Sequence, residues 1–194
     1  MYDFLYRHIK VEYPGERSKL LYTDTDSFVF AIESVDISRD MLARSECFDC
    51  SNYPRDHRCY SNENKKVIGK FKDELAGNIM TEFVALRAKM YAFTYNSDVN
   101  PAAERDGLAR PREVKKCKGI ARATVRKELT FAMYKHCLQS RRKRKGEMNV
   151  IRSDRHQVFT QKVWKVALSS YDDKRFLLDD VSSLPYGHYR IASL

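Results

Sequence analysis

The chain has 194 residues, of which 43% are apolar, including 10 phenylalanines and 12 tyrosines. This composition excludes a disordered chain and suffices for one domain or two small ones. Thirty-six lysines and arginines against 26 acidic residues give a net charge of +10. Such an excess favours a polyanionic partner, most often nucleic acid, although a basic surface without a partner has the same composition.

Several cell locations are disfavoured by the sequence. No apolar run approaches the roughly 18 residues of a membrane span, and the N-terminus lacks a signal-peptide pattern, so we expect an intracellular protein, not secreted, with no membrane partner. Five cysteines, an odd number with uneven spacing, favour a reducing compartment. The basic run 141–145 could be a nuclear-import signal, contact phosphates, or simply be solvated.

In chain order, apolar spacing over residues 1–10 predicts a helix that Pro14 and Gly15 end. Apolar runs on either side of a polar stretch predict a β-hairpin over 19–33. Residues 35–42 predict a short helix, with Asp36 or Ser38 near its start as the capping residue. The remaining predicted elements are a strand at 66–75, a turn at 76–78, a strand at 89–95, a loop at 97–114, a helix at 124–138, and strands at 158–168 and 175–178.

The tip of the hairpin carries two carboxylates, Asp24 and Asp26, separated by Thr25. In an extended backbone, residues two apart point to the same side, so both carboxylates are expected to face one way. Adjacent negative charges need cations between them, and two divalent metals roughly 3.5–4 Å apart form the apparatus for in-line displacement at phosphorus. The alternative is an ordinary polar turn, because Asp and Thr are common turn residues.

The stretch Tyr22-Thr-Asp24-Thr25-Asp26-Ser27 resembles motif C of the family B DNA polymerases, Tyr-x-Asp-Thr-Asp-Ser, which lies at the tip of a hairpin in the palm. All fixed positions of that motif match. The resemblance implies that Asp26 is the principal metal ligand and that Asp24 is its acidic neighbour, with both acting in catalysis. Tyr22, Thr25 and Ser27 would support the motif.

Other segments extend the resemblance along the chain. Leu86-Arg-Ala-Lys89-Met-Tyr91 is similar to the Lys-x-Tyr motif, whose lysine holds the primer terminus. The segment with Lys115, Lys116 and Lys118 looks like the lysine-rich entry to the thumb in the protein-primed branch. Segments 69–74, 172–175 and 184–188 resemble polymerases of Polinton (Maverick) transposons and related viruses. The chain is therefore similar to the C-terminal palm and thumb of a protein-primed family B polymerase of the viral or organellar type.

The resemblance implies an α+β fold, with an antiparallel palm hairpin and sheet, flanking helices, and then a small mixed thumb subdomain. The expected divisions are the C-terminal part of the palm at 1–96, a linker at 97–114, and a DNA-gripping thumb at 115–194.

Independently of the resemblance, Lys89 and Tyr91 on one strand face could hold a phosphate and pack against a sugar or base. The alternative is that the lysine is simply solvated.

The implied reaction is that of a DNA-directed DNA polymerase, a nucleotidyltransferase of DNA replication. The partners would be a primer-template, deoxynucleoside triphosphates and two Mg²⁺ ions. Lys89 and Tyr91 would hold the primer, and Lys115, Lys116 and Lys118 would contact DNA. Whether a terminal protein serves as primer is left open.

Motif A, motif B and the exonuclease motifs of the family do not occur in this sequence. The chain would thus be a fragment of a polymerase with an incomplete metal site, or a catalytically dead, transposon-derived remnant that still binds DNA. A third alternative is a zinc-dependent nucleic-acid binder, with Cys47, Cys50, His57 and Cys59 as candidate ligands.

Overall fold

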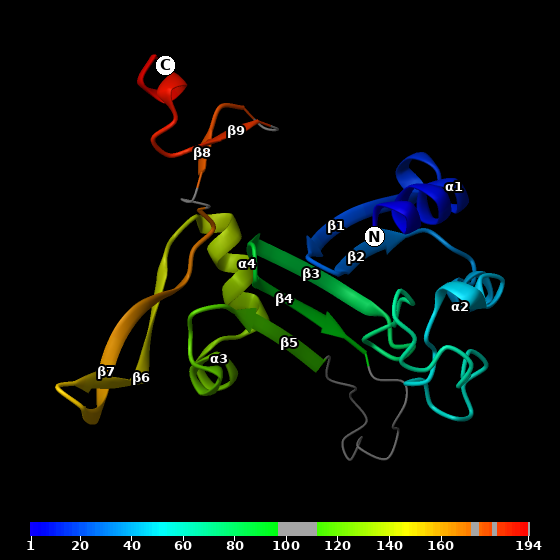
Figure 1. The fold of residues 1–194 in the computed structure, drawn as a ribbon, viewed down its shortest axis with the longest axis horizontal. Coiled ribbons are helices and arrows are strands. Elements are labelled where there is room, and N and C mark those ends of the chain that lie inside the picture. Colours follow the sequence, from blue (N-terminus) through cyan, green and yellow to red (C-terminus); the bar gives the residue numbers. More distant parts are fainter. Residues whose placement is uncertain (97–111, 172–174, 180–181, 194) are drawn as a thin grey trace. The chain divides into compact units, whose positions relative to one another are not determined.

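The computed structural model describes residues 1–96, 112–171, 175–179 and 182–193 (Figure 1). The fold is α+β, with several small antiparallel sheets and a few short helices, as expected. The chain forms two compact units, the first from Met1–Thr81 with Tyr95–Arg112 and the second from Glu82–Thr94 with Glu113–Leu194. The segment around Lys89 and Tyr91 therefore groups with the second unit.

The first unit begins with a π-helix, Phe4–Ile9, which continues into α1, Lys10–Glu12. The hairpin of β1 (Ser18–Asp24) and β2 (Ser27–Ile32) follows, and then α2 (Ile37–Leu42). The predicted helix, hairpin and short helix are thus confirmed. The Asp36 side chain accepts the Arg39 backbone N–H at 3.1 Å and so caps α2, as its sequence suggested.

The core of the first unit lies between the N-terminal helix and one face of the hairpin. Phe4, Leu5, Ile9 and Tyr13 are buried there, and the partly buried Phe28, Phe30 and Ile32 of β2 pack against them. These three β2 residues alternate along the strand, as a half-buried strand requires. A two-stranded sheet is marginal in water, so this helix is what stabilises the hairpin.

Residues 66–75 do not form the predicted strand. They run as turns, and Phe71 alone makes an isolated bridge, to Phe48. The reason is a pair of carboxylates that draw the backbone into loops. Asp49 accepts the N–H groups of Ser51 at 3.0 Å and Lys66 at 3.1 Å, and Asp73 accepts those of Leu75 and Gly77 at 2.8 and 2.7 Å. The predicted turn at 76–78 is present, with Ala76 and Gly77 at positive φ.

The second unit is built on a three-stranded sheet in the order β3 (Met80–Arg87), β4 (Met90–Tyr95) and β5 (Arg112–Cys117). The strand-end residues Met80, Thr81, Tyr95 and Arg112 group with the first unit. Two helices, α3 (Arg122–Glu128) and α4 (Phe131–Ser140), accompany it. The sheet, the two helices and residues 167–168 share one core, which consists of Val84, Leu86, Met90, Ala92, Cys117, Val125, Leu129, Phe131, Tyr134, Cys137, Ala167 and Leu168. The linker predicted at 97–114 falls mostly on 97–111, outside the described residues, and β5 already begins at Arg112.

The single helix predicted at 124–138 is wrong, because the chain breaks into α3 and α4 at Leu129 and Thr130, which are extended. Side chains of β5 satisfy the backbone groups that the break exposes. The Lys115 ammonium donates to the Leu129 carbonyl at 2.7 Å, and the Phe131 N–H donates to the Glu113 carboxylate at 3.1 Å. These contacts stabilise the interruption of the helix.

The chain continues into a long hairpin, β6 (Arg144–Asp154) and β7 (Gln157–Leu168), which confirms the strand predicted at 158–168. A short pair follows, β8 (Arg175–Leu177) and β9 (Ser183–Pro185). None of the helices in the described ranges has the length and apolarity that crossing a membrane requires.

Asp49 provides a test of the loop architecture. Its buried carboxylate also pairs with the Lys72 ammonium at 3.0 Å, and hydrogen bonds, those from Ser51 first, hold the pKa of the Asp49 carboxyl well below its ordinary value. Because this pKa is depressed in the folded state, the stabilisation is complete above the unfolded pKa of about 4 and is lost as the pH falls through the folded value.

We expect Asp49→Asn to lower the free energy of unfolding at pH 7 by about 2 kcal/mol, since partly buried N–H groups lose a charged acceptor. The difference from the wild type should shrink when the pH falls below about 4. Urea unfolding at pH 7 and pH 3 measures both effects. Asp56→Asn, at an exposed carboxylate, is the matched control, and equal stability of the two variants at pH 7 would contradict this role.

Candidate functional site

The tip of the β1–β2 hairpin is a tight turn. Asp24 pairs with Ser27, which leaves Thr25 and Asp26 as the two turn residues. The Asp26 N–H donates to the Asp24 carbonyl at 2.7 Å, and the Ser27 hydroxyl donates to the same oxygen at 3.1 Å. The Thr25 hydroxyl donates to the Asp24 carboxylate at 3.2 Å. All four residues therefore take part in shaping the tip.

Thr25 lies at φ +57°, in the left-handed region that β-branched residues rarely adopt. The N–H of Asp26 bonding back to the carbonyl of Asp24 makes a three-residue turn centred on Thr25. The backbone is therefore not extended between the two carboxylates. The extended backbone from which Asp24 and Asp26 were expected to face one way is therefore absent at the tip. A strained residue held at a polar tip is typical of functional sites.

Strand pairing decides which hairpin face carries the polar residues. Tyr22 pairs with Val29 and Asp24 with Ser27, so these four residues share a face. The opposite face carries Phe28 and Phe30, which pack toward the N-terminal helix. A register shift between Leu20 and Tyr22 accommodates the extra residue in β1. Tyr22, Asp24 and Ser27 thus lie on the face away from the core of their unit, and Asp26 is exposed in the turn.

Carboxylate oxygens are ligands that Mg²⁺ prefers, so Asp24 and Asp26 are of the right chemical type. They supply only two ligand side chains, however. Within the ranges that the structure describes, no three His, Cys, Asp or Glu side chains gather as a metal site. The candidate zinc ligands are not brought together as a ligand set either. The Cys59 thiol instead contacts the Ser38 carbonyl at 3.5 Å, and the His57 ring lies against Tyr53.

Lys89 lies in the two-residue turn between β3 and β4, at φ +58°, and not within the strand as predicted. Its carbonyl accepts the Lys118 N–H at 3.0 Å, so two of the predicted DNA-binding lysines are neighbours in the fold. Tyr91 follows on β4, with its ring near those of Phe83 and Phe93 at centroid distances of 5.8 and 6.5 Å. Since Met90 and Ala92 are in the core, Tyr91 is on the other face of the sheet.

The three lysines at the end of β5 have different surroundings. The Lys115 side chain is only 15% exposed, donates to the Leu129 carbonyl and lies 3.5 Å from Glu113. It is thus engaged within the fold. Lys116 and Lys118 are exposed. The fully buried Tyr134 donates its hydroxyl to the Lys116 carbonyl at 3.0 Å and so fixes the backbone at this position.

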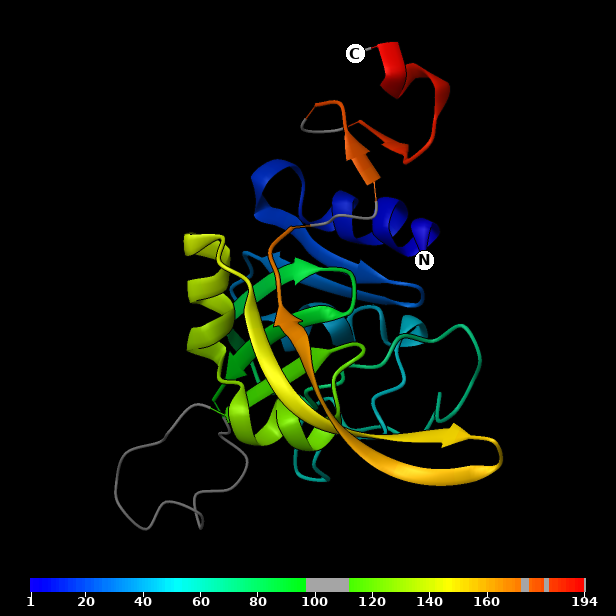
Figure 2. The ribbon, with the colours of Figure 1, turned by 90° about the vertical axis from the view of Figure 1, so that its left-hand side faces the viewer.

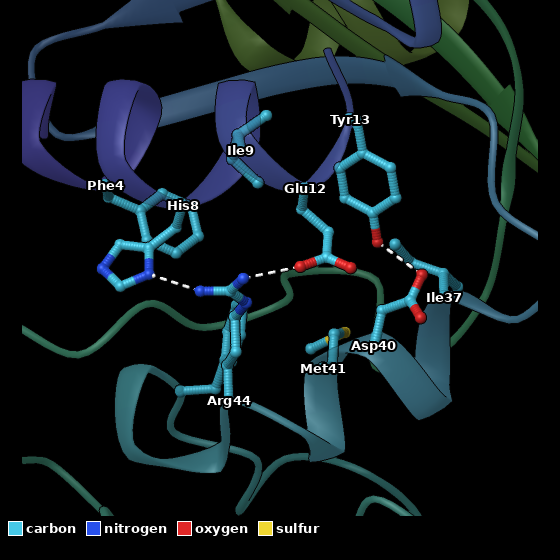
Figure 3. Close-up of a pocket in the computed structure, with 10 residues that line it drawn as sticks. Phe4, His8, Ile9, Glu12, Tyr13, Ile37, Asp40, Met41 and Arg44 are labelled. Carbon is cyan, nitrogen blue, oxygen red and sulfur yellow. Dashed lines mark hydrogen bonds and ion pairs between the residues drawn. The ribbon is translucent and has the colours of Figure 1, made fainter.

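A small pocket between the N-terminal helix and α2 was not foreseen from the sequence (Figure 3). Its polar side chains pair with one another. The Arg44 guanidinium bonds to His8 Nδ1 at 3.0 Å and to the Glu12 carboxylate at 2.5 Å, while the Tyr13 hydroxyl donates to Asp40. Burial and the neighbouring Asp40 raise the pKa of Tyr13 well above its ordinary value. The side-chain contacts across the pocket therefore link the N-terminal helix to α2 and the residues that follow it. In the sequence, the only local indication of these contacts is the i, i+4 spacing of His8 and Glu12.

No family model, no curated protein and no solved structure matches this chain.

The strain at Thr25 leads to a stability prediction. Glycine adopts positive φ without the steric cost that an L side chain has, so Thr25→Gly should raise the free energy of unfolding by about 1 kcal/mol. Thr23→Gly, two residues earlier and within β1, should lower it by about 1 kcal/mol, because glycine weakens a strand. Chemical unfolding of both variants measures the two shifts. Destabilisation of both to the same extent would contradict a strained tip.

Proposed function

We propose that this chain is the C-terminal palm and thumb part of a DNA-directed DNA polymerase of the protein-primed family B type. The observation that carries the proposal is the hairpin tip itself. Tyr22, Asp24, Thr25, Asp26 and Ser27 fill every fixed position of motif C, and they lie at the turn of an antiparallel hairpin, as that motif requires.

The positions of the other matching residues support the proposal. Lys89 is at a turn and in backbone contact with Lys118, so the proposed primer-holding and DNA-holding lysines belong to one surface region of the second unit. Lys116 is exposed beside them. Contacts from these side chains would be to phosphates, which hold a duplex without reading its sequence. Lys115 is better explained by its role in the fold.

The proposed reaction is attack of a primer 3′-hydroxyl on the α-phosphorus of a deoxynucleoside triphosphate, with loss of pyrophosphate. Asp26, exposed at the tip, would supply ligand oxygens to Mg²⁺, and Asp24 would add negative charge beside it. Bound Mg²⁺ would lower the pKa of the hydroxyl and neutralise charge on the triphosphate. Lys89 would hold the primer backbone. Further carboxylates are needed for a two-metal centre, and we assign them to motif A, which this sequence lacks.

A catalytically dead remnant that binds DNA is the alternative, favoured for the isolated chain because the tip offers only two carboxylates. Two observations separate the alternatives. The first is the reading frame upstream of Met1, where Asp-x-x-Ser-Leu-Tyr-Pro and Lys-x3-Asn-Ser-x-Tyr-Gly would support the polymerase. The second is primer extension by the 194-residue chain with Mg²⁺, where robust synthesis would contradict the remnant.

The role of Asp26 is tested in a polymerase that contains this chain together with motifs A and B. Asp26→Asn should lower the rate of primer extension by roughly 10³-fold, equivalent to about 4 kcal/mol, because a metal ligand loses its charge. DNA binding by the same variant should stay within about twofold, since phosphate contacts come from lysines elsewhere. Asp56→Asn is the control, with both properties unchanged. Full activity of Asp26→Asn would refute the assignment.

A further inference from the structure

The hairpin of β6 and β7 has the longest strands among the described residues of the second unit. Its two strands are of 11 and 12 residues, and its turn end stands away from α3 and α4 (Figure 2). Directly paired residues share a face of such a ribbon, as do residues two apart along a strand. By this register the outer face carries Lys145, Glu147, Asn149, Ile151, Val158, Lys162, Trp164 and Val166.

The inner face is covered near the base of the hairpin. Met148 is buried, and its sulfur accepts the Ala121 N–H at 3.4 Å. A Cβ added to Gly146 would meet the Ala167 and Thr124 side chains at 3.4 and 3.5 Å, so α3 packs closely there. The residues named on the outer face are exposed except Glu147, which is partly buried. Large apolar side chains on it are exposed: Ile151 by 78%, Val158 by 72% and Trp164 by 67%.

Positive charge is concentrated on the same element. Residues 141–168 contain nine lysines and arginines against two acidic residues, and the five basic residues of the run 141–145 are all exposed. The turn residues Arg155 and His156 both lie at positive φ, 44° and 65°, where Asn-Gly is the usual choice. The hairpin therefore displays Arg155 at its tip despite backbone strain.

The surroundings of Trp164 favour a particular kind of partner. Lys162 lies two residues away on the same face, and Lys145 is a diagonal neighbour across the ribbon. The acidic residue opposite, Glu147, is paired with Lys162 at 2.9 Å. Lysine is depleted from protein–protein interfaces, whereas an exposed aromatic ring among lysines is typical of surfaces that bind unpaired bases. In a duplex the base faces are already stacked, so a ring can stack on them only in a single strand.

We propose that the outer face of the β6–β7 hairpin binds single-stranded nucleic acid, with a base stacked on Trp164 and phosphates held by Lys145 and Lys162. The inference rests on the proposed function for its class of partner, but it does not involve Asp24 or Asp26. It adds a single-strand contact to the duplex grip that the lysines of β5 would supply.

The chain has one tryptophan, so its fluorescence reports on this surface alone. Titration with a dodecathymidylate at low salt should quench Trp164, whereas heparin, a polyanion without bases, should bind without comparable quenching. Equal quenching by heparin would overturn stacking. Quenching by anionic phosphatidylserine vesicles and not by the oligonucleotide would indicate a membrane contact and would also overturn the proposal.

Variants test the contribution of the ring to affinity, measured by anisotropy of a labelled dodecathymidylate. Trp164→Ala should weaken binding by about 5- to 100-fold, and Trp164→Phe should recover most of the loss, as expected for stacking on one base. Phe159→Ala is the matched control, because Phe159 is an exposed aromatic residue on the inner face of the same strand. The affinity of this variant for the oligonucleotide should stay within about twofold of the wild-type value. Wild-type affinity in Trp164→Ala would refute the proposal.

The salt dependence tests the two lysines separately from the ring. Replacing Lys145 and Lys162 by alanine should reduce the slope of log affinity against log salt by about 1.4, since each single-strand phosphate contact contributes about 0.7. An unchanged slope would show that Lys145 and Lys162 do not contact the phosphates. Because these tests do not involve Asp26, their failure would leave the proposed catalytic role of Asp26 unaffected. If primer extension shows the tip to be inactive while Trp164→Ala loses affinity for the oligonucleotide, the chain would instead be a DNA-binding remnant.

Discussion

Small sheets need covering elements, and this requirement governs the structure. Within the described ranges, one sheet has three strands and the other three have two each. A two-stranded sheet is marginal in water on its own. The β1–β2 hairpin meets the requirement through β2, whose aromatic face packs on Phe4, Leu5 and Ile9 of the N-terminal helix. The motif at its tip thus depends on a helix that precedes it in the chain.

The same requirement explains why the β6–β7 hairpin is divided into two regions. Its base is covered by α3 through Met148 and Gly146, and the last residues of β7, Ala167 and Leu168, are fully buried. Beyond the base, the strands pair only with each other. Exposed apolar side chains on that part are costly unless they have a use, because they promote association. A partner of opposite charge is a consistent reason for retaining them.

The features predicted correctly from the sequence depend on short-range rules. The N-terminal helix, the β1–β2 hairpin and the capping of α2 by Asp36 follow from periodicity and local hydrogen bonds. The errors arise where side chains distant in sequence satisfy the backbone. Asp49 holds the N–H of Lys66, 17 residues away, and Glu113 holds that of Phe131, 18 residues away. No window of neighbouring residues contains that information.

The candidate site likewise has features that could be predicted from the sequence and features that could not. The positions of Asp24 and Asp26 at a hairpin tip were predictable, but the left-handed conformation of Thr25 was not, because β-branched residues seldom adopt it. Alternation placed Lys89 and Tyr91 on one strand face but misjudged Lys89, which lies in a turn where its carbonyl contacts Lys118. Lysines near one another in sequence looked equivalent, yet Lys115 is held inside the fold.

The two proposed activities differ in what they require of this chain. Metal-assisted phosphoryl chemistry needs several carboxylates around two cations, and the hairpin tip contributes two. Binding a single strand needs an exposed ring and nearby cations, which the β6–β7 hairpin supplies from one continuous segment. Of the two proposals, nucleic-acid binding is therefore the one that requires no further carboxylate donor, whereas catalysis requires carboxylates that the described residues of this chain do not bring together at the tip.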